Sequence, residues 1–319
     1  MTELACQESR PLTKVFVEMP QRAIKYAVID AFTGEAFKGN PAAVCLLEET
    51  TDVDEHWMLS VAKEFNISET CFLTRVVSTV ESYPNSSNQS VDIPRFSLRW
   101  FTPVAEVNLC GHATLASAHF LFTSALLEHE TVEFITKSGL LTAKKVTKSK
   151  SASKDMKLFI ELDFPADQVV KCNASELPSI PLTLNGLSLI NVLKTTASDD
   201  FIVEVSSGKE VAELQPNFNE IQKCAGRGVI VTGQAPDGSG FDFFSRFFCP
   251  KLGVNEDPVC GSAHCALVPY WSRKLQKKSL TAFMASPRSG VLHLELDDKS
   301  QRVRISGEAV TVMVGTLLV

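Results

Sequence analysis

Two short stretches of this chain place a thiol beside a glycine, each at the start of a run of small apolar residues. They read Cys110-Gly111-His112 and Cys260-Gly261-Ser262. A helix that begins at such a step presents unpaired N–H groups and a partial positive charge, which bind anions such as carboxylates. The same field lowers the pKa of a cysteine at the helix start. If the two stretches face each other, a bound carboxylate would lie between two thiols that can move a proton across a carbon.

Packing and metal binding are the competing interpretations. Cysteine is among the most buried residue types, so packing is the simpler interpretation for either cysteine alone. For two cysteines at equivalent positions of a repeat, packing and chemistry deserve equal weight. We expect no metal site, because the cysteines and histidines lack the CxxC or HxxxH grouping that zinc sites use.

The chain repeats itself around these two stretches. Residues 96–118 align with residues 243–268, and the matched residues are Arg99 with Arg246, Phe101 with Phe248, Pro103 with Pro250, and Cys110 with Cys260. Two further pairs of segments, which start at Ile24 and Met156 and at Val132 and Leu280, follow in the same order. Three matches in register predict a duplicated unit.

Each unit reads as strands followed by a helix and a hairpin. Runs such as "KYAVIDAF", "ETCFLTRVV" and "FSLRWFT" alternate or are β-branched, which predicts strands. The helix expected at residues 112–127 is apolar on nearly every side, so we expect it to be buried. Its counterpart in the second unit is expected to be cut short or kinked at Pro269, which has no N–H donor. The simplest architecture is a set of strands wrapped around one buried helix, formed twice.

A different kind of helix is predicted within residues 51–65. Its apolar residues form a single stripe, made of Val53, Trp57, Val61 and Phe65. One stripe predicts a helix on the outside of the first unit, and Thr51 or Asp52 is the expected cap.

The predicted organisation has four parts. Residues 1–22 are expected to be a loose extension, because they hold no apolar signal segment and carry acids that transit peptides avoid. Residues 23–153 and 154–307 form the two halves, with the boundary in the low-complexity stretch "KSKSASKD". Residues 308–319 are left over as a strand, which we expect to cross back and complete the first half.

Composition excludes several partners and compartments. The formal net charge of -6 argues against nucleic-acid binding, which needs a basic face. No apolar stretch approaches the ~20 residues that span a bilayer, so we expect no membrane partner. The 9 cysteines have no regular framework spacing, which favours reduced thiols in the cytoplasm.

Five motifs, in order, resemble the PhzF family, and among its members the animal phenazine biosynthesis-like domain-containing proteins. They are "DAFTGEAFKGNPAAV", "NISETCFLT", "RWFTPVAEVNLCGHATLASA", "EDPVCGSAH" and "ISGEAVTVMVGTL", and the resemblance covers residues 25–319. It implies the α+β, diaminopimelate-epimerase-like fold, with two pseudo-symmetric halves, each a sheet rolled around a central helix. The active site of that fold lies between the halves.

The resemblance also implies a set of site residues. Glu69 corresponds to the family's general acid/base, which moves a proton between carbon positions, and His112 and Asp257 assist it. A carboxyl group partly withdrawn from water can both take and return a proton. The expected substrate-binding residues are Asn40, Gly111, Gly261 and Ser262. The resemblance implies no metal, flavin or nicotinamide cofactor, a small carboxylate-bearing substrate and, as in many relatives, a homodimer.

One residue departs from the family pattern and keeps an alternative open. Cys260 stands where the motif commonly has threonine, and racemases of the same fold place their two catalytic cysteines at the positions of Cys110 and Cys260. The chain is therefore expected to be either a PhzF-type isomerase that uses Glu69 or a two-cysteine racemase or epimerase. A third hypothesis is a catalytically silent protein that binds a ligand or a partner.

Overall fold

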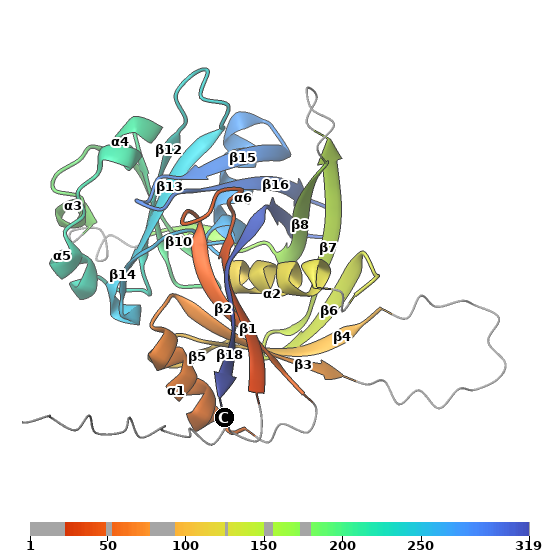
Figure 1. The fold of residues 1–319 in the computed structure, drawn as a ribbon. Coiled ribbons are helices and arrows are strands. Elements are labelled where there is room, and N and C mark those ends of the chain that lie inside the picture. The colour runs from red at the N-terminus through yellow and green to blue at the C-terminus, as the bar shows by residue number, and fades with distance from the viewer. Residues whose placement is uncertain are drawn as a thin grey trace, which may run out of the picture.

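A computed structural model describes residues 23–48, 53–76, 93–124, 127–149, 156–172 and 180–318 (Figure 1). The expected extension at residues 1–22 lies outside the described residues, as does most of the expected boundary stretch. We call residues 23–149 with 309–318 the first half, and residues 156–307 the second half. No helix in the described ranges is long and apolar enough to cross a membrane.

The first half is a sheet with two helices. β1 is paired on one side with β2 and on the other with the C-terminal strand β18, from Ala23 opposite Leu318 to Ala31 opposite Ala309. The elements are β1 (Ala23–Ala31), β2 (Asn40–Leu47), α1 (Glu55–Phe65), β3 (Glu69–Val76), β4 (Arg95–Phe101), β5 (Glu106–Val107), α2 (Gly111–Thr123), β6 (Thr131–Thr136), β7 (Gly139–Ser149) and β18 (Ala309–Leu318).

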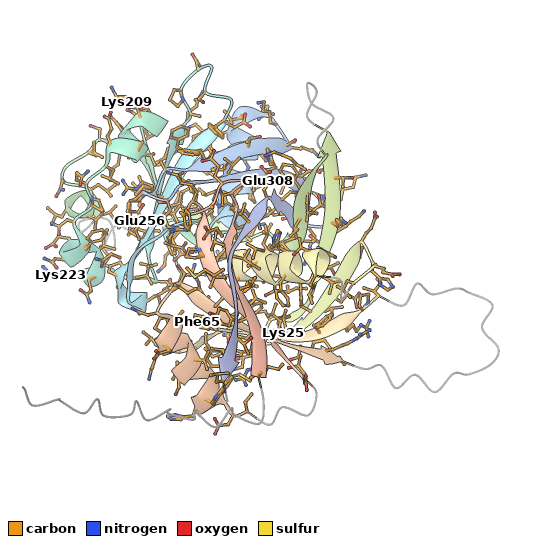
Figure 2. All side chains as sticks on the ribbon, viewed as in Figure 1. Lys25, Phe65, Lys209, Lys223, Glu256 and Glu308 are labelled. Carbon is orange, nitrogen blue, oxygen red and sulfur yellow. The ribbon has the colours of Figure 1, made fainter. Side chains whose placement is uncertain are left out.

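The second half continues the same sheet, because β7 pairs with β8. Its helices α4 and α5 lie at the periphery, where Lys209 and Lys223 are labelled in Figure 2. The elements are β8 (Met156–Pro165), β9 (Val169–Lys171), α3 (Ile180–Thr183), β10 (Leu189–Thr195), β11 (Phe201–Val205), α4 (Gly208–Glu213), α5 (Phe218–Lys223), β12 (Val229–Gln234), β13 (Phe243–Cys249), η2 (Pro250–Leu252), β14 (Val254–Asp257), α6 (His264–Leu275), β15 (Ser279–Met284), β16 (Gly290–Asp297) and β17 (Arg302–Gly307).

The strands pair in the same order in both halves. In the first half β2 and β3 are parallel, β3 and β4 are antiparallel, and β4 is parallel to β6. In the second half β11 and β12 are parallel, β12 and β13 are antiparallel, and β13 is parallel to β15. In both halves the matched arginine forms a bidentate ion pair with a glutamate: Arg99 with Glu106, and Arg246 with Glu256. Duplication would produce this pattern, and the duplication itself stays a prediction.

The helix predicted to be buried is buried. Every residue of α2 from Gly111 to His119 is shielded from solvent, and strands of the first half pack around it (Figure 1). This confirms the interpretation of its apolar surface. The helix ends at Thr123 rather than at residue 127, because the backbone at Ser124 is extended.

The second helix was predicted to be cut short or kinked at Pro269; the first alternative was wrong, and the kink stays a prediction. α6 runs through Pro269 to Leu275. Proline cannot donate to the carbonyl four residues earlier. That carbonyl, on Cys265, instead accepts a hydrogen bond from the backbone N–H of Asp167 at 3.0 Å. The N–H of Asp167 therefore replaces the hydrogen bond that Pro269 cannot donate.

Helix α1 lies on the outside of the first half, as its single apolar stripe predicts. Its buried residues Met58 and Ala62 join a small core with Cys45 and Phe72. The cap is Asp54, whose Oδ1 accepts from the N–H of Trp57 at 2.8 Å. The expected caps Thr51 and Asp52 lie outside the described residues, and Asp54 takes that role because it directly precedes the first turn.

Candidate active site

Two backbone turns, one from each half, touch at the starts of the central helices. α2 begins at Gly111, and the turn that leads into α6 contains Gly261. A Cβ built on Gly111 would lie 3.3 Å from the Cα of Gly261, and one built on Gly261 would lie 3.4 Å from the Cα of Gly111. This approach leaves little room for a side chain at either position. The backbone at the start of α2 therefore lies close to the turn that leads into α6.

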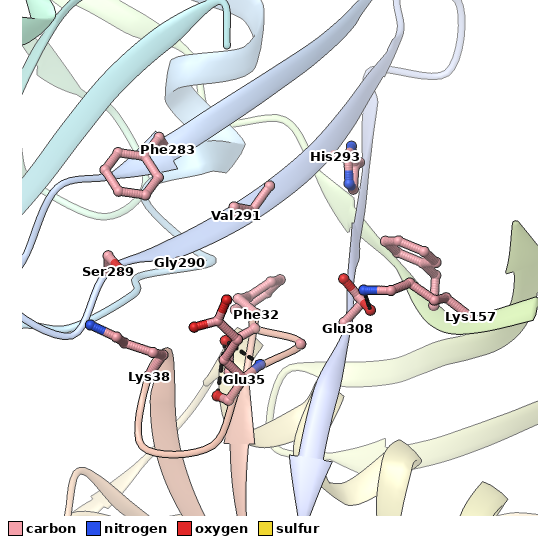
Figure 3. A pocket seen from close by; sticks show the side chains of 13 residues that line it. Phe32, Glu35, Lys38, Lys157, Phe283, Ser289, Gly290, Val291, His293 and Glu308 are labelled. Atoms are coloured by element: carbon pink, nitrogen blue, oxygen red, sulfur yellow. Dashed lines mark hydrogen bonds and ion pairs between the residues drawn. The ribbon is translucent and has the colours of Figure 1, made fainter. Parts of the chain in front are cut away.

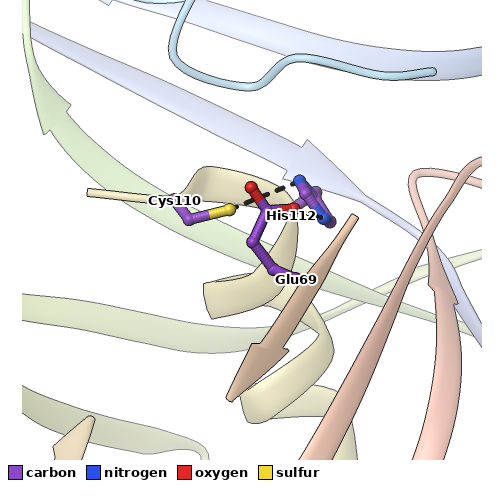
Figure 4. A group of neighbouring side chains, drawn as sticks. All are labelled: Glu69, Cys110 and His112. Carbon is purple, nitrogen blue, oxygen red and sulfur yellow. Dashed lines mark hydrogen bonds and ion pairs between the residues drawn. The ribbon is translucent and has the colours of Figure 1, made fainter. Parts of the chain in front are cut away.

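Glu69 and His112 meet beside this contact (Figure 4). Glu69 is the first residue of β3, and His112 is the second residue of α2. The Oε2 of Glu69 lies 2.9 Å from the Nε2 of His112, and their side chains are only 15% and 3% exposed. A carboxyl group and an imidazole this close and this shielded can share a proton and pass it on.

Asn40 connects this pair to Asp257 in the second half. The fully buried Asn40 donates through Nδ2 to Oδ1 of Asp257 at 2.8 Å and to the carbonyl of Val259 at 3.1 Å. The same Nδ2 lies 3.0 Å from Nδ1 of His112. An amide NH2 group carries two hydrogens, so Asp257, Val259 and His112 share them.

The charges in this cluster shift two pKa values. Burial raises the pKa of Asp257 to about 6, although His112 opposes the shift. Burial alone would lower the pKa of His112, but the carboxyl groups of Glu69 and Asp257 outweigh it and raise that pKa. Groups with pKa values near the working pH are the most effective general acids and bases.

The two cysteines lie beside the site, but burial suppresses their ionisation. Sγ of Cys110 lies 3.4 Å from Nδ1 of His112, and Sγ of Cys260 lies 3.3 Å from Oγ of Ser262. Both residues are buried, and this burial raises the pKa of each thiol well above its ordinary value. The expectation that the helix starts lower these pKa values was wrong, because the loss of water and the nearby carboxyl groups outweigh the helix field.

The donor atoms of Glu69, Cys110 and His112 lie within 4.8 Å of one another, which is close enough to hold a cation. A thiol must lose its proton to become a good ligand, and the raised pKa of Cys110 opposes that. The carboxyl and imidazole groups already contact each other directly. The group therefore fits proton transfer better than metal binding.

A separate cavity of about 320 Å³ lies behind Phe32 (Figure 3). The ring of Phe32 lines it and also lies 3.5 Å from the Cβ position of Gly261, so it stands between the cavity and the glycine contact. Lys157 and Glu308 form a 2.6 Å ion pair in the wall. The cavity is distinct from the cluster around Glu69.

The structure thus brings the predicted site residues into one place. Glu69, His112, Asn40 and Asp257 form a connected set, and Gly111, which contacts Gly261, directly precedes His112. What the sequence does not predict is the bond between Asn40 and Asp257, because 217 residues separate them. The motif around each residue was visible, but no local pattern indicates that the two side chains meet.

Comparison with known proteins gives the class to which this fold and site belong. The chain belongs to the phenazine biosynthesis-like protein family (PhzC-PhzF), whose pattern it matches over residues 29–315. Phenazine biosynthesis-like domain-containing protein 1 of Mus musculus is 39% identical over 303 residues, which cover 91% of this chain and 97% of that protein. The resemblance found in the motifs is confirmed.

Two further relatives bear on activity and fold. An uncharacterized isomerase of Halalkalibacterium halodurans is 43% identical over 297 residues, which cover 91% of this chain and 97% of that protein. The crystal structure of a PhzF family protein from Enterococcus faecalis has a TM-score of 0.75 and 35% identity, covering 93% of this chain and all of that one. The predicted α+β fold and the predicted enzyme class, an isomerase, are confirmed.

Proposed function

We propose that this chain is a cofactor-independent isomerase that moves a proton between carbon positions of a small carboxylate-bearing molecule. Glu69 is the general acid/base, and His112 and Asp257 assist it. The observation that carries the proposal is the 2.9 Å contact between Oε2 of Glu69 and Nε2 of His112, next to the paired helix starts. General acid/base catalysis of this kind contributes about 100- to 10,000-fold in rate.

The substrate binds through its carboxylate to N–H groups at the helix starts, those of Gly111, Gly261 and Ser262. Two converging helix starts favour an anion there. Asn40 offers its Oδ1, which is buried and has no hydrogen-bond partner among the described residues. Because the Nδ2 of Asn40 is already engaged, it meets the substrate as an acceptor, and a substrate hydroxyl or amino group is the matching donor.

The reaction then needs only proton transfer. The Glu69 carboxylate takes a proton from one carbon, and the electron pair of that C–H bond stays on the substrate. The anion-binding N–H groups stabilise the developing charge. Glu69 then returns the proton to another carbon of the same molecule, while His112 holds the carboxyl group in place. No atom or electron is gained or lost overall.

The two-cysteine racemase is the alternative, and its support is the position of Cys110 and Cys260 at the matched helix starts. Against it, a thiol base must ionise, and both thiols have pKa values raised well above the ordinary range. In this alternative, Cys110→Ala or Cys260→Ala alone stops the inversion, and Glu69→Gln is tolerated.

The proposal is tested by deuterium incorporation. The full-length protein is incubated in D₂O with L- and D-amino acids, prolines and cyclic dihydro-hydroxy acids. Carbon-bound deuterium is then measured by mass spectrometry. For any molecule that takes up label, Glu69→Gln is expected to slow incorporation at least about 100-fold. Full activity of Glu69→Gln would exclude Glu69 as the base.

A further inference from the structure

One wall of the cavity behind Phe32 is apolar, although it lies on the face of the sheet that points away from the core (Figure 3). On β16, Leu292 and Leu294 are buried in the core, whereas Val291 and His293 lie on the opposite face and line the cavity. Phe283 on β15 lies directly opposite Val291 and lines the cavity too. Outward positions of a sheet are usually polar, and further along β16 this face carries acids. An apolar wall confined to the cavity indicates a surface for a ligand.

The facing loop carries two charged groups, one of each sign. Glu35 and Lys38 lie three residues apart between β1 and β2, and both line the cavity. Within the described residues, the Glu35 carboxylate and Nζ of Lys38 form no ion pair and no side-chain hydrogen bond. Lys157 and Glu308 in the same cavity already pair with each other. Glu35 and Lys38 are therefore the charges that a ligand can neutralise.

These two charges restrict the class of ligand. Glu35 repels a simple anion and Lys38 repels a simple cation, whereas a zwitterion matches both groups. In an α-amino acid the ammonium and carboxylate groups share one carbon atom, so both can reach charges on a single short loop. Ser289 lies at the same end of the cavity as Lys38, and its hydroxyl group can donate to the carboxylate (Figure 3). The aromatic ring of Phe283 then favours a ligand that carries an aromatic side chain.

Phe32 separates this cavity from the catalytic cluster. The residue is fully buried, and its carbonyl accepts from the N–H of Val291 at 3.0 Å. The far side of its ring lies 3.5 Å from the Cβ position of Gly261, at the contact between the two halves. A ligand in the cavity therefore lies on one side of Phe32, and the substrate site lies on the other.

We propose that this cavity binds an aromatic α-amino acid, at a site separate from that of the proposed reaction. The ammonium group of the ligand contacts Glu35, and its carboxylate contacts Lys38 and Ser289 through charge-assisted hydrogen bonds. Its ring packs against Phe283 and Val291. The volume of about 320 Å³ lies at the lower end of the range for small-molecule sites, which suits a ligand of this size.

Matched ligands test the class of molecule that binds. The affinity of the full-length protein for L-phenylalanine is measured by titration calorimetry. The comparison ligands are 3-phenylpropionate, which lacks the ammonium group, phenethylamine, which lacks the carboxylate, and L-alanine, which lacks the ring. L-Phenylalanine is expected to bind at least about tenfold more tightly than each of them. No binding of L-phenylalanine, or equal affinity for any of the other three, overturns the inference.

Two variants assign the charged contacts. Lys38→Met should weaken the binding of L-phenylalanine about tenfold without weakening that of phenethylamine, which has no carboxylate. Glu35→Gln should weaken the binding of L-phenylalanine about tenfold without weakening that of 3-phenylpropionate. A folding defect would weaken every ligand alike, so this crossed pattern excludes one. Unchanged affinity for L-phenylalanine in either variant contradicts the proposed contacts.

Two controls separate this site from the catalytic cluster and from net charge. Glu69→Gln should keep the affinity for L-phenylalanine within about twofold, because the cluster lies beyond Phe32. If Glu69→Gln abolishes binding instead, the amino acid occupies the catalytic cluster and the inference is wrong. Lys209→Met removes a lysine that is 74% exposed on α4 and should leave the affinity unchanged. An equal loss in Lys209→Met and Lys38→Met would reduce the effect to net charge and overturn the site.

Discussion

At the scale of single residues, the site depends on two shifted pKa values: burial raises that of Asp257, whereas Glu69 and Asp257 raise that of His112 against the effect of burial. Asp257 accepts from Asn40 and from the N–H of Val259 at 3.1 Å, yet burial still raises its pKa. The sequence predicted Asp257, Glu69 and His112 as site residues, because each lies in a recognisable motif. It could not predict their shared environment, which comes from segments far apart in the chain.

The raised pKa of Asp257 makes stability depend on pH in a defined direction. With an ordinary value of 3.8 and a folded value of about 6, the protonated form stabilises the fold by roughly 3 kcal/mol. This contribution is complete below about pH 4 and is lost as pH rises through about 6.

Asp257→Asn should remove that dependence. In urea unfolding between pH 4 and pH 8, the stability of the unaltered protein should fall relative to the variant across this window. Parallel curves for the two proteins would show that Asp257 ionises normally.

At the scale of elements, the helix starts are the most informative feature. The burial of α2 could be predicted because its apolar residues leave no polar face. The course of α6 could not, because the acceptor that Pro269 frees is satisfied by Asp167 from another segment.

The contact between the helix starts predicts the effect of one methyl group. Gly111→Ala places a Cβ 3.3 Å from the Cα of Gly261, so the two turns must separate by a few tenths of an ångström. Alanine favours helix by up to about 1 kcal/mol over glycine, which offsets part of the strain. We expect stability within about 1 kcal/mol of the unaltered protein, and at least about tenfold slower deuterium incorporation. Unchanged incorporation would show that the glycine contact does not set the geometry of the site.

At the scale of the whole molecule, the two halves are also connected away from the glycine contact, through hydrogen bonds made by Arg288. Arg288 in the second half donates to Oδ1 of Asp30 at 2.7 Å and to the carbonyl of Gly39 at 2.8 Å. Asp30 is only 1% exposed, and Gly39 directly precedes Asn40. The two halves could be predicted from the repeat. The ion pair between Arg288 and Asp30 could not, because 258 residues separate the two positions.

Removing the Arg288 side chain should affect both the stability and the activity of the protein. Arg288→Met leaves the Asp30 carboxyl buried without its charged partner, which costs about 3 kcal/mol. It also releases the Gly39 carbonyl next to Asn40, so deuterium incorporation should slow. Arg304→Met removes an arginine from an exposed pair with Glu295 and should cost under about 1 kcal/mol. Equal losses for the two variants in urea unfolding would contradict the role given to Arg288.

The central claim is that Glu69, and not the cysteine pair, moves the proton. The most direct measurement is the deuterium incorporation rate of Glu69→Gln beside that of the double variant Cys110→Ala with Cys260→Ala, on the same substrate. The account predicts that Glu69→Gln loses at least about 100-fold while the double cysteine variant stays within about tenfold of the unaltered protein. Loss of incorporation in the cysteine variant with full activity in Glu69→Gln would contradict the account and make the protein a two-thiol racemase.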